Sequence, residues 1–185
     1  MHVYRCRLPR WDAPGIPVFL TWRLWDSLPP ERVFPKEKLA SGETFVAFDR
    51  LLDTAGSGPT YLQQPPIATL VMKQLQQVCG GSLHAFVVMP NHVHLLCTPE
   101  QRLPELVRKL KGPTAFHANK LLGRDGKFWQ PEYFDRMVRN DREFLQIQRY
   151  IEWNPVKAGL AGDPGDFQWS SAHRRGERGS SLARA

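Results

Sequence analysis

Three stretches of the chain carry the hydrophobic pattern of strands. In PVFLTWRL (17–24) apolar and polar residues alternate with a period of two, as in a strand with one buried face. LHAFVVM (83–89) is apolar almost throughout, which predicts a strand covered on both faces. HVHLLCT (92–98) follows after only Pro90-Asn91, and so short a link predicts an antiparallel hairpin.

Helical spacing of apolar residues occurs between these stretches and after them. It predicts helices over 45–52 and over 63–81, the second opening with prolines and closing at Gly80-Gly81. Residues 103–122 also have a helical pattern, which Gly112-Pro113 is expected to break or kink. A last helix is predicted over 141–153, with Asn140 or Asp141 as its cap, after a mixed loop over 124–141.

The predicted elements indicate an α+β fold in which helices pack on a small antiparallel sheet, as in ferredoxin-like folds. A chain of 185 residues that is 42% hydrophobic suits one domain, which we place at 1–169. Residues 170–185 are rich in Ser, Gly and Arg and are expected to form a flexible basic tail.

Composition narrows the class of protein. No run of 18 apolar residues and no signal peptide occur, so we expect a cytoplasmic protein without a membrane partner. The three cysteines lack C-x-x-C spacing, which argues against a disulfide framework and a structural zinc site. The net charge is +7, and residues 102–185 carry 16 Lys and Arg against 10 Asp and Glu. Such a basic half favours nucleic acid as the partner over a merely solvated surface.

Two histidines stand one residue apart in the third predicted strand. Residues i and i+2 of a strand project to the same face, so His92 and His94 are placed to share one divalent metal. The pair alone also fits histidines that are exposed or only hydrogen-bonded. Two histidines with one oxygen ligand would leave positions for water and phosphate oxygens, which suits Mg²⁺ or Mn²⁺.

QRYIEWNPVKAGL (148–160) contains candidates for the remaining groups. Tyr150 and Asn154 are four residues apart and therefore lie on one side of a helix. Docking of this helix on the sheet would bring a phenol and an amide oxygen to the histidines. The alternatives are a tyrosine at the core edge and an Asn154 that caps a short turn beginning at Pro155.

MPNHVHLL together with YIEWNPVKAGL resembles the paired signature of the single-tyrosine HUH transposases, most closely the REP-associated tyrosine transposases related to insertion-sequence transposases. Segments 7–29, 128–141 and 167–174 resemble the same family, so the likeness spans most of the chain. It implies an HUH endonuclease core, a divalent metal on His92 and His94, and Tyr150 as the catalytic residue. Asn154 occupies the position where relatives carry a third ligand, commonly Gln. The implied substrate is a repetitive extragenic palindromic (REP) hairpin.

The residues would support cleavage of single-stranded DNA through a 5′-phosphotyrosyl intermediate, by a monomer or a homodimer. Two other hypotheses remain open, namely a module that binds hairpins without cutting them and a metal-dependent phosphoesterase that uses water. The candidate DNA-binding residues are Arg108, Lys109, Lys111, Lys120, Arg124, Lys127, Trp129, Arg136, Arg139 and Lys157.

Overall fold

The computed structural model describes residues 14–27 and 58–173. The helix predicted over 45–52 and the cysteine at position 6 lie outside these ranges. Within them, no helix is both long enough and apolar enough to cross a membrane.

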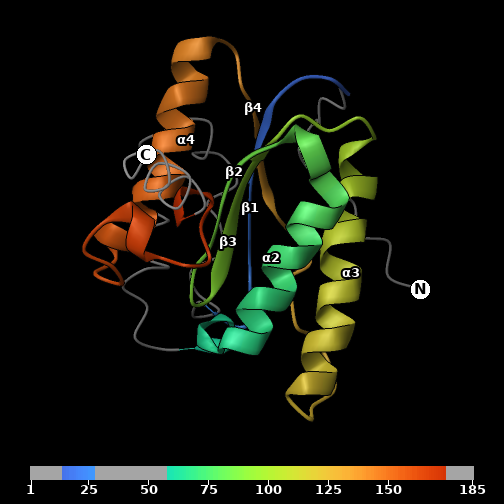
Figure 1. Cartoon of the computed structure of the whole chain (residues 1–185). Helices are drawn as coiled ribbons and strands as arrows, with labels where there is room; N and C mark the ends of the chain where they lie inside the picture. Colours follow the sequence, from blue (N-terminus) through green and yellow to red (C-terminus); the bar gives the residue numbers. More distant parts are fainter. Residues whose placement is uncertain (1–13, 28–57, 174–185) are drawn as a thin grey trace, which may run out of the picture.

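Four antiparallel strands form one sheet between two layers of helices (Figure 1). The strands are β1 (Val18–Arg23), β2 (Leu83–Val88), β3 (His92–Cys97) and β4 (Phe134–Met137), in the spatial order β2-β3-β1-β4. Helices α2 (Pro65–Cys79) and α3 (Leu103–Leu121) cover one face of the sheet, and α4 (Asp141–Lys157) covers the other. The β1-α2-β2-β3-α3-β4 order with this strand arrangement confirms the predicted α+β, ferredoxin-like class.

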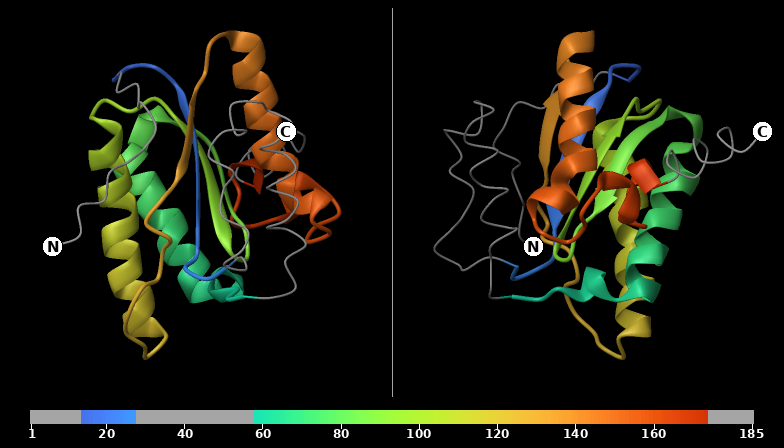
Figure 2. Two further views of the ribbon diagram at one scale, coloured as in Figure 1. Left: turned by 180° about the vertical axis from the view of Figure 1, so that it is seen from behind. Right: turned by 60° about the vertical axis from the view of Figure 1, so that its left-hand side comes forward.

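Strand β1 lies in the middle of the sheet, paired with β3 on one side and β4 on the other. We expected only one buried face, but all six of its residues are buried. The reason is the third helix: α2 and α3 cover the face of Leu20 and Trp22, while α4 packs against the face of Phe19. Figure 2 shows α4 on the side of the sheet opposite to α2 and α3.

Helix α2 confirms the helix predicted before the hairpin, whereas α3 corrects the break expected at Gly112-Pro113. Helix α3 is continuous through Pro113. A proline lacks the N–H that would bond the carbonyl four residues earlier, here that of Lys109. The side chain of Gln74 on α2 donates to that carbonyl oxygen at 2.9 Å, so the neighbouring helix replaces the missing donor.

Strand β4 lies in the stretch expected to be a loop. Its four residues, Phe134–Met137, are only partly buried, and it pairs with β1 at an edge of the sheet. Because FDRM has two charged residues at its centre, it does not show the apolar alternation that marks a buried strand. The prediction of a loop was therefore wrong here, and the strand is specified by its pairing with β1.

Helix α4 begins as predicted and ends later than predicted. Asn140 caps it, its side-chain oxygen accepting a hydrogen bond from the Glu143 backbone N–H at 2.9 Å. The helix continues through Asn154 and Pro155 to Lys157. Asn154 and Pro155 are both buried, so packing outweighs the tendency of a residue before proline to leave the helix. Asn154 is therefore an interior helical residue, and the reading of it as the cap of a new turn was wrong.

The segment after α4 returns to the free edge of β2. Ser170 forms an antiparallel bridge with Val87, and the Val88 N–H donates to the Trp169 carbonyl at 2.9 Å. Ser170 is buried, so residues 170–173 of the predicted tail pack on the domain. Residues 174–185 lie outside the described ranges.

Candidate active site

The two histidines of β3 face α4 and lie against each other. Their Nε2 atoms are 3.0 Å apart and both side chains are 0% exposed. The strand register places Thr21 of β1 and Val87 of β2 on either side of His94. The predicted arrangement of two imidazoles on one strand face is therefore present.

Each histidine uses its other ring nitrogen for a contact with a buried polar side chain. His92 Nδ1 lies 2.7 Å from Asn91 Oδ1, and because an amide oxygen only accepts, Nδ1 carries the hydrogen. His94 Nδ1 lies 2.7 Å from the hydroxyl oxygen of Thr21, which can donate or accept. In this tautomer His92 keeps its Nε2 lone pair, and His94 can do the same whenever Thr21 accepts.

Helix α4 brings Tyr150 and Asn154 to the histidines. The Tyr150 ring centroid lies 5.8 Å from that of His94 and 6.3 Å from that of Phe19, each edge to face. Asn154 is buried, and its carboxamide nitrogen lies 3.5 Å from His94 Nε2. Tyr150 is half-buried. The helix thus gathers a phenol and an amide around the two imidazoles.

The donor set fits a divalent cation. Two donors that each lie about 2.1 Å from one ion are roughly 3.0 to 3.4 Å apart, close to the spacings of 3.0 Å and 3.5 Å found here. A half-turn of the Asn154 amide would exchange its nitrogen for oxygen, the atom that binds cations. In the described part of the chain no three His, Cys, Asp or Glu side chains could hold a metal together, so a third protein ligand from these residues has to be of another type.

The hydrogen-bond partners of the two histidines are of the kind that usually orient metal-ligating histidines. A ligating histidine generally donates its second ring N–H to an oxygen, which fixes the ring orientation. Asn91 and Thr21 provide such oxygens to His92 and His94. Sequence reasoning missed both, reading Asn91 as a turn residue and Thr21 only as a strand position. Asn91 next to His92 was a usable signal, whereas the role of Thr21 depends on the register of β1 with β3.

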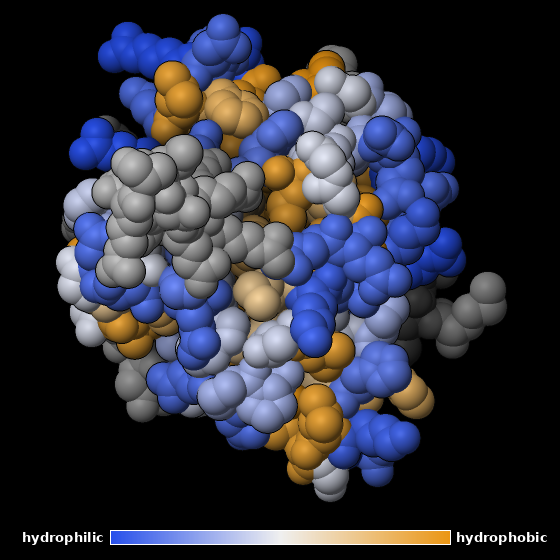
Figure 3. Space-filling view, viewed as in Figure 1, coloured by the Kyte–Doolittle hydropathy of each residue, from blue (hydrophilic) through white to orange (hydrophobic). Residues whose placement is uncertain are grey.

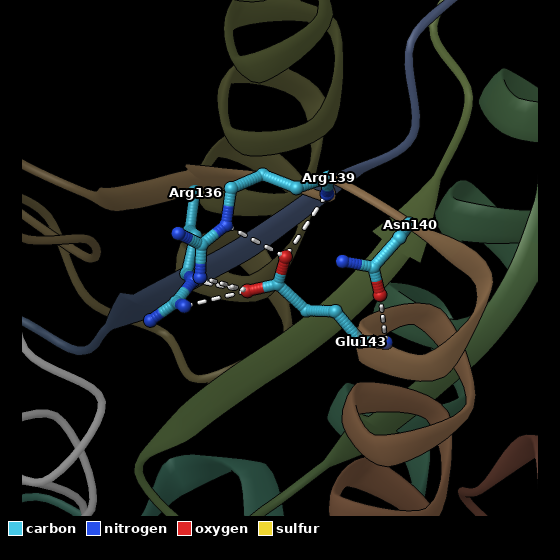
Figure 4. Close-up of polar contacts among 4 residues, drawn as sticks. All are labelled: Arg136, Arg139, Asn140 and Glu143. Atoms are coloured by element: carbon cyan, nitrogen blue, oxygen red, sulfur yellow. Dashed lines mark hydrogen bonds and ion pairs between the residues drawn. The ribbon is translucent and has the colours of Figure 1, made fainter.

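The first turn of α4 is fixed to β4 by a carboxylate between two guanidinium groups (Figure 4). Arg136 Nε donates to Glu143 Oε1 at 2.8 Å, and Arg139 Nε donates to Oε2 at 3.1 Å. Burial alone would raise the pKa of the Glu143 carboxyl, but hydrogen bonds from Arg139 and Arg136 outweigh burial and lower it to about 2. Glu143 and Tyr150 are seven residues apart on one side of α4, so this ion pair orients the tyrosine helix.

The residues predicted to bind DNA do not form one surface. Arg108, Lys109, Lys111 and Lys120 lie on α3, and the sheet separates them from the histidines. Arg124 and Lys127 lie over the rings of Tyr61 and Trp25, at 5.0 Å and 4.0 Å. Arg136 and Arg139 bind Glu143. Of the ten residues, Lys157 is the one with a described contact to Tyr150, its Nζ lying 4.7 Å from the ring centroid.

Trp129 is a core residue, which corrects its prediction as a stacking platform for DNA bases. It is 6% exposed, packs edge to face on Trp22 at 6.2 Å, and donates its indole N–H to the Thr114 hydroxyl at 2.9 Å. Phe128 is buried as well. The outer surface in the view of Figure 3 is largely hydrophilic, with apolar side chains in separate patches.

Comparison with known proteins covers the segment that contains this candidate site. Residues 67–154 match the model of the family described as Transposase IS200 like, a segment that contains both histidines, Tyr150 and Asn154. The chain is 44% identical over 92 residues to the ISDra2 transposase TnpA of Deinococcus radiodurans, covering 44% of this chain and 64% of that protein. It is 32% identical over 100 residues to the REP-associated tyrosine transposase of Escherichia coli K12, covering 52% and 58%.

These matches span somewhat less than two thirds of the length of either relative. A solved structure of a REP-associated tyrosine transposase bound to a REP hairpin shares the fold, with a TM-score of 0.61 and 21% identity over 97% of this chain and 87% of that one. The family match covers the hairpin with the two histidines and the helix with the tyrosine, and the fold is common to a transposase. The segment of residues 67–154, which holds both histidines and the tyrosine, is thus similar to the family of IS200-like transposases.

Proposed function

We propose that this protein is a metal-dependent endonuclease and strand transferase that cuts single-stranded DNA through a 5′-phosphotyrosyl intermediate on Tyr150. The convergence of His92, His94 and Asn154 with Tyr150 carries the proposal, because a core tyrosine or a histidine pair alone would not require all four together. The names of the relatives support DNA hairpins of the REP type as the substrate.

His92, His94 and Asn154 would hold the cation, with Mg²⁺ or Mn²⁺ suiting a set of two imidazoles and one amide oxygen. A divalent cation bound there supplies a Lewis acid that polarises the scissile phosphate and offsets the charge that develops on its oxygens. Asn91 would keep His92 in the orientation and tautomer that this role needs, and Thr21 would orient His94 and favour the same tautomer when its hydroxyl accepts.

Tyr150 would be the nucleophile. Its phenolic oxygen forms a bond to phosphorus while the bond to the 3′ oxygen breaks; the phenol gives up one proton and the departing oxygen gains one. The product is a 5′-phosphotyrosyl enzyme and a free 3′ hydroxyl. Since the new phosphodiester keeps the energy of the old one, another 3′ hydroxyl can attack it and join strands without a further energy source.

Among the basic residues predicted to bind DNA, those not bound to Glu143 would contact the DNA backbone. Because the residues on α3 lie across the sheet from Tyr150, we assign them to the duplex stem of a hairpin rather than to the cleaved strand. Trp129 is left out of this surface because it is buried.

The test is trapping of the covalent intermediate. Purified protein is incubated with a labelled pool of single-stranded hairpins and Mn²⁺ or EDTA, then resolved by denaturing electrophoresis. We expect a metal-dependent adduct that is lost in Tyr150→Phe and retained in Tyr133→Phe, a matched control whose ring packs against the core on the α2 and α3 face. Cleavage without an adduct would establish hydrolysis by water instead, and hairpin binding without cleavage would establish a binding module.

A further inference from the structure

Lys157 is the last residue of α4 and lies beside the proposed nucleophile. Its Nζ is 4.7 Å from the Tyr150 ring centroid. The two residues are seven apart, which at about 100° per residue puts them only about 20° apart around the helix. A cation over an aromatic ring is held there by the negative charge of the ring face. Lys157 is therefore kept at the active-site end of the helix before any DNA binds.

The ammonium of Lys157 differs from other cations among the residues predicted to bind DNA. Arg136 and Arg139 bind the Glu143 carboxylate, and Lys111 donates to the carbonyl oxygens of Gln130 and Pro131 at 2.5 and 3.1 Å. Within residues 14–27 and 58–173, the Lys157 side chain forms no ion pair and no hydrogen bond. Its ammonium group contacts the Tyr150 ring instead. Its three N–H donors are left for a ligand.

The class of ligand follows from charge. An exposed ammonium with no carboxylate partner, next to a phenol, attracts an anion, and the anion that the proposed chemistry brings to Tyr150 is a phosphodiester. On the basis of the proposed function, we infer that Lys157 binds a non-bridging oxygen of the phosphate that Tyr150 attacks. It is thus a catalytic residue rather than one of the general contacts to the DNA backbone.

A lysine near the substrate can act in two ways that kinetic measurements distinguish. A contact to a distant phosphate strengthens DNA binding equally before and during reaction, which changes the concentration for half-saturation. A contact to the reacting phosphate strengthens as negative charge builds on its oxygens, which changes the rate at saturation. Lys157 belongs to the second kind because of its position on the nucleophile's own ring.

The experiment measures single-turnover adduct formation as a function of hairpin concentration for the wild type, Lys157→Met, Lys157→Arg and Lys73→Met. Lys73 lies exposed on α2, across the sheet, and its replacement removes the same charge. We expect Lys157→Met to lower the saturating rate at least about tenfold with less than about a twofold change in half-saturation. Lys157→Arg should recover most of the rate, and Lys73→Met should match the wild type.

A substrate in which only the scissile phosphate is uncharged shows whether Lys157 binds that phosphate. A methylphosphonate at the scissile position, located by sequencing the trapped DNA, removes the negative charge that Lys157 would bind. The wild type and Lys157→Met should then differ by less than about twofold, because residue and phosphate act as a coupled pair. An equal loss on both substrates, or a loss confined to half-saturation, would overturn the inference while leaving the tyrosine mechanism intact. Absence of any wild-type adduct would overturn both.

Discussion

The two faces of the sheet differ in what they bury. On the face of α2 and α3, β3 contributes Val93, Leu95 and Cys97 to a continuous apolar core. On the face of α4, the same strand contributes His92, His94 and Leu96, and the neighbouring strand adds Thr21. One face is covered by two helices and the other by one, which carries the tyrosine. Alternation along a single strand thus separates the residues of the apolar core from those that we propose carry the chemistry.

The two faces also differ in the interactions that stabilise them. Buried polar groups cost free energy unless they are hydrogen-bonded, so the α4 face is kept in place by specific pairs: Thr21 with His94, Asn91 with His92, and Glu143 with two arginines. The other face relies mainly on shape and apolar area. We therefore expect the stability of the α4 face to depend on charge, on pH and on the proposed metal, whereas that of the α2 and α3 face should be nearly independent of all three.

The largest effects on stability and activity are expected from replacing one buried residue on each face. Leu95→Ala removes a fully buried side chain from the apolar face and should lower the free energy of unfolding by about 3 kcal/mol. His94→Gln keeps a polar side chain of similar size and should cost about 1 kcal/mol, but it should abolish the adduct and the rise in Tm that we expect Mn²⁺ to give the wild type. Chemical denaturation and thermal melts with Mn²⁺ or EDTA measure both.

Leu95→Ala serves as the control for the metal response. Below its own melting temperature it should keep both the adduct and the Mn²⁺ shift, because Leu95 lies on the far side of the strand from the histidines. If His94→Gln lost as much stability as Leu95→Ala and the wild type showed no Mn²⁺ shift, the histidines would be core residues, and the contrast between the faces would disappear.

The sequence predicted the elements that are marked by their own residues and missed those that depend on distant partners. The central strands, α2 and the histidine pair follow from local periodicity, because each is marked by its own residues. Strand β4, the continuity of α3 through Pro113 and the role of Thr21 depend on partners distant in sequence: β1, Gln74 and His94. Trp129 shows the reverse error, since an aromatic residue among charged ones looked exposed until its contact with Trp22 placed it in the core.

A smaller effect on stability is expected from replacing Glu143, the carboxylate at the start of α4. The folded pKa of Glu143, about 2, lies below the value near 4.3 of an unfolded glutamate. Its ionised form therefore stabilises the fold above about pH 4.3, and this contribution is lost as the pH falls toward 2. Glu143→Gln should cost about 2 kcal/mol at pH 7, because hydrogen bonds to a charged group are lost.

The signature of this effect is its pH dependence. The difference in unfolding free energy between the wild type and Glu143→Gln, measured with urea, should shrink from pH 7 to pH 3. Glu100→Gln, an exposed carboxylate outside the helices, should show almost no difference at either pH. A cost of Glu143→Gln that stayed constant with pH would mean that shape, rather than charge, fixes α4 to β4.

The smallest effect is expected on the α2 and α3 face, from a polar contact that joins these two helices. Gln74 supplies the Lys109 carbonyl with the hydrogen bond that Pro113 cannot give. Gln74→Ala should therefore cost about 1 kcal/mol in the natural chain. In a Pro113→Ala background the helix has its own N–H for that carbonyl, so the same change should cost close to nothing. A double-mutant cycle by urea denaturation measures the coupling. Equal costs in both backgrounds would mean that Gln74 contributes by packing, and that α3 tolerates Pro113 for a reason other than this donor.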